Sequence, residues 1–93
     1  MIQEFQDDLI KFLFQNKDAR QYKDDLDAAL FDMNMHKQLF IFWHHYVTKY
    51  SSIPTKPAFL EFVDRELKKA TEKVKTKIYV NISNRLLRII LFG

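Results

Sequence analysis

The stretch that decides the fold is the most apolar segment of the chain, MHKQLFIFWHHYVTKY at residues 35–50. Positions 36, 39, 40, 43, 46, 47 and 50 repeat at the three- and four-residue spacing of an amphipathic helix. Ile41 and Phe42 lie off that stripe, so this helix is expected to be packed on more than one face. The segment therefore predicts a central helix with Trp43 largely buried.

A second helix is predicted before the central one. Residues 3–15 place apolar side chains at helical spacing, namely Phe5, Leu9, Phe12 and Leu13. Asn16-Lys17-Asp18 interrupts this pattern, and Asp18 is expected to cap a short helix that ends near Leu26. Residues 24–31 are expected to form a helical turn or loop that leads into the central helix.

The segment after the central helix carries stop and start signals. Pro54 disfavours the helical conformation at Ile53 and so ends the central helix. Thr55 can serve as the N-cap of a further helix over residues 58–69, with Pro57 in its first turn.

The last third of the chain is ambiguous between a strand and a helix. Residues 78–82 alternate like a strand and are rich in β-branched side chains. A helical stripe also runs through Val74, Ile78, Ile82, Leu86 and Ile89. A lone strand would leave its backbone groups without partners, so a long helix over residues 70–91 is predicted.

Length and composition favour one all-α domain. The chain has 93 residues, of which 47% are hydrophobic, but only one Gly and two Pro, which is too few turn residues for an all-β sandwich or barrel. We predict a small bundle of about five helices, with residues 1–69 forming the bundle and residues 70–93 a C-terminal helix that could be one arm of a helical hairpin. The expected core comprises Phe5, Leu9, Leu39, Phe40, Trp43, Val47, Phe59 and Leu67.

No pattern in the sequence predicts catalysis, a cofactor or a metal ion. The only Gly is Gly93, so neither a Walker A loop nor a dinucleotide fingerprint can form, and there is no Cys. His44 and His45 are adjacent and His36 is about two turns away, so they cannot share one metal, and they are expected to border the core. Asp7 and Asp8 are expected to be solvated. The absence of a long apolar run or a secretory signal predicts a soluble, cytoplasmic protein without membrane contact.

The charges are distributed unevenly along the chain. Residues 1–32 hold four Lys/Arg and eight Asp/Glu, a net charge of −4, whereas residues 65–93 hold eight and two, a net charge of +6. A basic tail suggests nucleic-acid contact or head-to-tail association, and a solvated helix face is the simpler reading. The candidate nucleic-acid contacts are Lys73, Lys75, Lys77, Arg85 and Arg88, which are expected to be spread around the helix without a base-stacking platform.

The end of the chain is unusually apolar. Residues 86–92 read LLRIILF, which is too apolar for a free helix end in water. Two explanations stay open: the tail covers the chain's own core, or it pairs with another chain. The residues expected to contact a partner are Ile78, Ile82, Leu86, Ile89 and Ile90.

The order of these elements resembles the N-terminal domain of DnaB-type replicative helicases, especially the phage forms. The resemblance covers residues 5–69 and rests on helical patterns. Its segments are Phe5 to Phe14, Leu30-Phe31-Asp32 with His36-Lys37, Leu39-Phe40 through Tyr46, Val47-Thr48-Lys49-Tyr50, Ile53-Pro54-Thr55, and Phe59 to Leu67.

The resemblance implies a non-catalytic oligomerisation and docking module of a DNA-replication helicase. Such a domain is an all-helical bundle with a helical hairpin, pairs with further copies of itself and offers a surface to primase or a helicase loader. Residues 70–92 would correspond to the first arm of that hairpin; the second arm and the ATPase domain have no counterpart in this sequence. The chain would then be either an excised domain of such a helicase or a free-standing relative that binds a helicase, in the cytoplasm of a bacterial host if it is viral. The alternative is a small regulatory protein that binds DNA directly through its basic tail.

Overall fold

The helical periodicity of the sequence is reproduced by an all-helical structure. The computed structural model describes residues 3–67 and 72–86. Its elements are α1 (Gln3–Gln15), the 3-10 helices η1 (Lys17–Tyr22) and η2 (Ala28–Leu30), α2 (Asn34–Tyr50), α3 (Lys56–Glu66) and α4 (Glu72–Leu86). None of the residues in the two described ranges lies in a strand. The predicted all-α class is confirmed. Within the predicted tail helix residues 72–86 are helical, including residues 78–82, and residues 70–71 and 87–91 lie outside the described residues.

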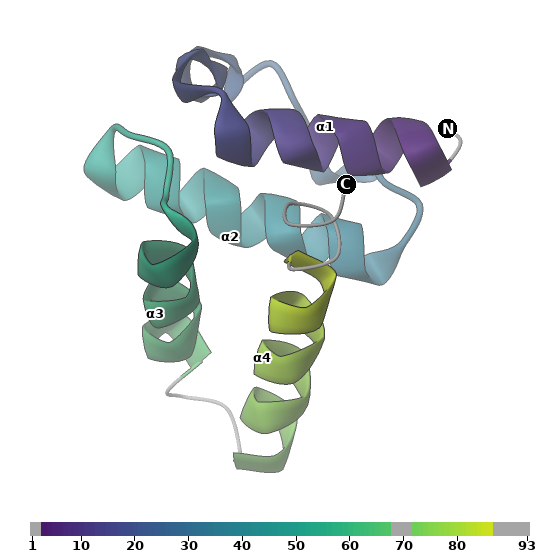
Figure 1. Cartoon of the computed structure of the whole chain (residues 1–93), viewed down its shortest axis with the longest axis vertical. Coiled ribbons are helices and arrows are strands. Elements are labelled where there is room, and N and C mark those ends of the chain that lie inside the picture. The colour runs from purple at the N-terminus through teal and green to yellow at the C-terminus, as the bar shows by residue number, and fades with distance from the viewer. Residues whose placement is uncertain (1–2, 68–71, 87–93) are drawn as a thin grey trace.

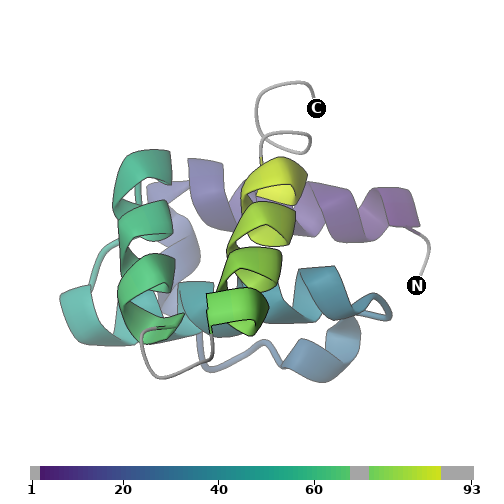
Figure 2. The same cartoon turned by 90° about the horizontal axis from the view of Figure 1, so that it is seen from below.

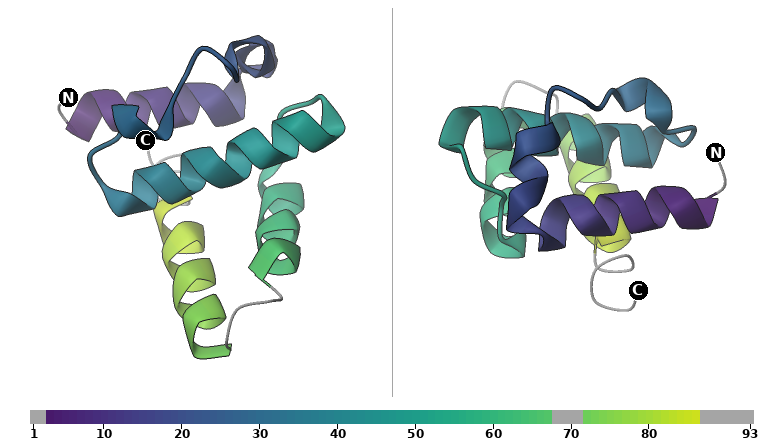
Figure 3. Two further views of the ribbon diagram at one scale, coloured as in Figure 1. Left: turned by 180° about the vertical axis from the view of Figure 1, so that it is seen from behind. Right: turned by 90° about the horizontal axis from the view of Figure 1, so that it is seen from above.

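The four α-helices form two groups. α1 and α2 lie alongside each other, as Figures 1 and 3 show, and η1 and η2 connect them at the edge of this pair. α3 and α4 both extend from the opposite side of α2 and lie side by side, which Figure 2 shows from below. α2 therefore contacts every other α-helix, as expected of the most apolar segment.

Short polar side chains fix where the helices begin. The side-chain oxygen of Asn16 accepts a hydrogen bond of 2.9 Å from the Asp18 backbone N–H, so Asn16, not the predicted Asp18, caps η1. Thr55 Oγ1 accepts from the Ala58 N–H at 3.3 Å, which confirms the predicted cap of α3. Ser51 is the C-cap of α2 and adopts a left-handed conformation (φ 56°). The Ser51 carbonyl accepts a 2.8 Å hydrogen bond from Arg20 Nη1.

The core is centred on α2. Trp43 has no exposed surface, as predicted, and its indole Nε1–H donates a 2.8 Å hydrogen bond to the Leu13 carbonyl near the end of α1. The Phe14 ring packs edge-on against Phe59 of α3, with 4.7 Å between centroids. Of the other predicted core residues, Leu39, Phe40, Val47, Phe59 and Leu67 are buried.

α1 buries a different face from the one predicted. Phe5 is 54% exposed and Leu9 is only partly buried, so the expectation for Phe5 is wrong. The buried stripe instead runs through Gln6, Ile10, Leu13 and Phe14. The reason is that Gln6 makes two hydrogen bonds to Asp32: its Nε2 donates to a carboxylate oxygen at 3.2 Å and its Oε1 accepts from the backbone N–H at 3.0 Å. A satisfied amide can be buried, so Gln6 lies on the buried side of α1 together with Ile10 and Leu13.

α4 belongs to the same core as the other helices. Ile82 has no exposed surface, and the partly buried Ile78 packs against the same cluster. α4 contacts both α2 and α3. The described part of the tail segment, α4, therefore packs into the same core as residues 3–67.

Candidate functional site

The residues expected to contact a partner are divided between the core and the undescribed end of the chain. Ile82 is covered by its own chain, which corrects the expectation that it is available to a partner. Ile78 is partly buried against the core. Leu86 is the last residue of α4, and its side chain is not described; Ile89 and Ile90 lie outside the described residues. Residues 78 and 82 therefore contribute to the chain's own core. For the apolar end at residues 86–92 both explanations stay open.

Three of the five candidate nucleic-acid contacts have side chains that the structure describes. Lys73 and Lys77 are exposed, whereas Arg85 is half-buried. Lys73 and Lys77 are four residues apart, so they point to the same side of α4. The side chain of Lys75 is not described, and Arg88 lies outside the described residues. Lys73 and Lys77 thus share one side of α4, and the expectation that the five basic residues are spread around the helix stays a prediction.

A pocket connects α4 with the start of α2. It has a volume of about 220 Å³ and is lined by Met35, Asn81, Asn84 and Arg85. Among the described residues no carboxylate lies within ion-pair distance of Arg85, and none lines the pocket. The first turn of α2 contains no acidic residue, and Met33 provides no side-chain cap. The pocket therefore presents the N–H donors of Asn81, Asn84 and Arg85, and no carboxylate lines it.

The residue that follows the pocket-lining Met35 in the sequence is a buried histidine. His36 has no exposed surface, and its Nε2 lies 2.8 Å from Asp7 Oδ1 of α1. Because a carboxylate can only accept, the proton of the neutral imidazole is on Nε2, which donates to Asp7. Nδ1 has no hydrogen-bond partner among the described residues. Asp7 is thus an anchor for His36, where the sequence predicted a solvated carboxylate.

The environment of His36 opposes a second proton. Burial lowers the pKa of His36 below its ordinary value of 6.5, the Asp7 carboxylate partly offsets this, and the positive charge of Arg85 lowers the pKa further. The geometry gives the same direction, because a proton on Nδ1 would have no acceptor. His36 is therefore held neutral, and its role in the structure is to join α1 to α2.

This direction predicts a loss of stability in mild acid. A depressed pKa in the folded state means that the unfolded chain binds more protons below about pH 6.5. The free energy of unfolding should therefore be highest above that pH and fall as the pH decreases from about 7.5 to 5.5. Urea denaturation at a series of pH values measures this. His36→Gln should flatten the dependence while the exposed His45→Gln should retain it; a wild-type stability that stays level through this range would contradict the assignment.

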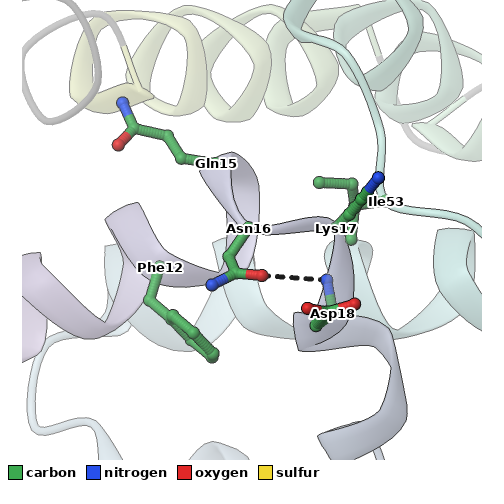
Figure 4. Close-up of a pocket in the computed structure, with 6 residues that line it drawn as sticks. All are labelled: Phe12, Gln15, Asn16, Lys17, Asp18 and Ile53. Atoms are coloured by element: carbon green, nitrogen blue, oxygen red, sulfur yellow. Dashed lines mark hydrogen bonds between the residues drawn. The ribbon is translucent and has the colours of Figure 1, made fainter.

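A second opening among the described residues lies at the C-terminal end of α1. It has a volume of about 570 Å³ and is lined by Phe12, Gln15, Asn16, Lys17, Asp18 and Ile53. Figure 4 shows the Asn16–Asp18 hydrogen bond between Phe12 on one side and Ile53 on the other. A neighbouring hollow shares Lys17, Asp18 and Ile53 and adds Arg20 and Ser52. Asn16 caps η1, and Arg20 donates a hydrogen bond to the Ser51 carbonyl in the turn after α2. These polar groups of the two openings therefore have local structural roles.

Within the described residues no group of three or more His, Asp or Glu side chains could hold a metal ion. His44 Nε2 lies 3.8 Å from Asp24 at the protein surface. None of the described helices has the length and apolar character needed to span a bilayer.

Sequence reasoning missed Asn81 and Asn84, although their spacing from Lys77 could have found them. It also missed the His36–Asp7 pair, whose members are 29 residues apart and share no local pattern.

Comparison of the chain with protein-family models, with curated proteins and with solved structures found no match.

Proposed function

We propose that the chain is a non-catalytic, all-helical association and docking module of a DNA-replication machine, as its resemblance to the N-terminal domain of DnaB-type helicases implies. Its partners would be further copies of itself and a primase, helicase loader or helicase. The all-helical bundle agrees with the fold expected from the resemblance. The functional part of the proposal rests on the sequence pattern and on the apolar end of the chain.

One observation carries the proposal: the chain has more apolar residues than its described core uses. Each α-helix already contributes a side chain without exposed surface, namely Ile10, Trp43, Phe59 and Ile82. The sequence nevertheless continues after α4 with five apolar residues and Arg88 over residues 87–92. Contiguous apolar side chains of this kind are characteristic of protein interfaces. We therefore assign residues 87–92 to contact with another chain.

Placing a carboxylate in this segment tests the proposal. Ile89→Asp should lower the sedimentation coefficient to that of a monomer, because an unpaired charge is costly to bury in an apolar interface. The helical circular dichroism should remain, since the described core does not include residue 89.

The matched control is Ile41→Asp, which introduces the same charge at a side chain of α2 that is 43% exposed. It should sediment like the wild type. An Ile89→Asp variant that also sediments like the wild type would contradict the proposal.

A further inference from the structure

The outward side of α4 carries a continuous row of hydrogen-bond donors. Lys73, Lys77, Asn81 and Asn84 are all exposed, and their spacings of four, four and three residues place them along one side of the helix. Ile82 lies on the opposite side and is buried. We call the four exposed residues together with Arg85 the donor stripe. Apolar packing explains the inner side of α4, but it does not explain this outer side.

The end of the donor stripe is recessed. Asn81, Asn84 and Arg85 line the pocket of about 220 Å³, and Met35 of α2 closes its apolar side. Arg85 is half-buried and forms no ion pair within the described part of the chain. A planar guanidinium beside two amides can donate several hydrogen bonds to one oxyanion. The pocket is the right chemical environment for a phosphate group.

We propose that the donor stripe binds the phosphate backbone of a nucleic-acid duplex, with one phosphate in the Arg85 pocket. The stripe has three positive charges and no carboxylate among its members. At 1.5 Å per residue, Lys73 and Asn84 are roughly 16 Å apart along the helix, about half a turn of B-DNA. The row is thus long enough to follow several successive phosphates of a duplex backbone.

Two features favour a duplex over the other polyanions. Proteins that bind single strands stack bases on aromatic side chains, and the donor stripe contains none. An acidic protein would not need a linear row of amides beside the lysines, whereas amides and guanidinium groups commonly contact phosphate oxygens. The charge of this part of the sequence agrees, since residues 65–93 have a net charge of +6. This inference does not depend on self-association, because it involves no residue beyond α4.

A salt titration of duplex binding tests the inference. The probe is a labelled DNA duplex of about 20 base pairs, two helical turns, and the readout is fluorescence anisotropy with the full chain. Three phosphate contacts predict that the logarithm of the binding constant falls against the logarithm of salt concentration with a slope of about −2.7. Affinity should accordingly fall about 40-fold between 50 and 200 mM salt.

The variants separate the donor stripe from general charge. Lys73→Gln with Lys77→Gln removes two contacts and should make the slope shallower by about 1.8. Lys17→Gln with Lys49→Gln removes the same charge from exposed positions outside α4 and should leave the slope unchanged. Asn84→Asp, which puts a negative charge in the row, should weaken binding as strongly as the double lysine variant.

Three results would overturn the inference. The first is no duplex binding at about 50 mM salt. The second is a salt dependence of binding that becomes equally shallow in the Lys73/Lys77 and the Lys17/Lys49 double variants. The third is tighter binding of poly-glutamate than of the duplex, which would instead identify an acidic polypeptide as the partner. Ile89→Asp should retain duplex binding, so failure of the association proposal is distinguishable from failure of this one.

Discussion

Replacing Trp43 with alanine is expected to lower the free energy of unfolding by about 3–5 kcal/mol. The side chain has no exposed surface, so its removal leaves a cavity at the centre of α2. The substitution also deletes the donor that satisfies the Leu13 carbonyl at 2.8 Å. Domains of this size have a total stability of about 5–15 kcal/mol, so a large unfolded population is expected.

Urea denaturation followed by circular dichroism measures this loss. Trp43→Phe keeps an aromatic ring but lacks the N–H donor, so it should fall between the wild type and Trp43→Ala. Ile41→Ala, at an exposed position of the same helix, should cost less than about 1 kcal/mol. A loss below about 1 kcal/mol for Trp43→Ala would show that this part of the core is misplaced.

A carboxylate at position 82 is expected to unfold the whole bundle. Ile82 lies in the common core of α1, α2, α3 and α4, where a charged group would have no partner. The cost of an uncompensated buried charge is about 3–5 kcal/mol, and the loss of the isoleucine side chain adds to it. The burial of Ile82 in its own chain thus predicts loss of the fold and not only of a contact between chains.

Two neighbouring changes serve as controls for Ile82→Asp. Val80→Asp places the same charge two residues away on a side chain that is 46% exposed, and its helical signal should equal that of the wild type. Ile82→Val removes one methylene and should cost about 0.5–1.5 kcal/mol. A folded Ile82→Asp protein with reduced mass would instead place residue 82 at an interface between chains.

The helices could be predicted because local patterns determine them. The spacing of apolar residues in the central segment, the Thr55 cap and Pro57 all act within a few residues of one another. The buried face of α1 could not be predicted in this way. Gln6 is buried because of Asp32, which is 26 residues away, and no local pattern shows that an amide will be satisfied at that distance.

The candidate sites also divide into local sequence patterns, which could be predicted, and contacts between distant residues, which could not. The donor stripe is a periodic pattern within α4, and counting asparagine with lysine would have predicted it from the sequence. The pocket needs Met35 as well, and the His36–Asp7 pair joins α2 to α1. Such contacts are determined by tertiary packing. For Ile82, the pattern correctly indicated an apolar face, but it could not distinguish the chain's own core from a second chain.

The molar mass of the full chain in solution tests the central claim, that its apolar end pairs with another chain, most directly. Light scattering at low and high salt should give a dimer or higher oligomer under both conditions, because apolar contacts are not screened by salt. A monomer at both salt concentrations would contradict the proposed association. An oligomer that dissociates at high salt would also contradict it, because the contact would then be electrostatic.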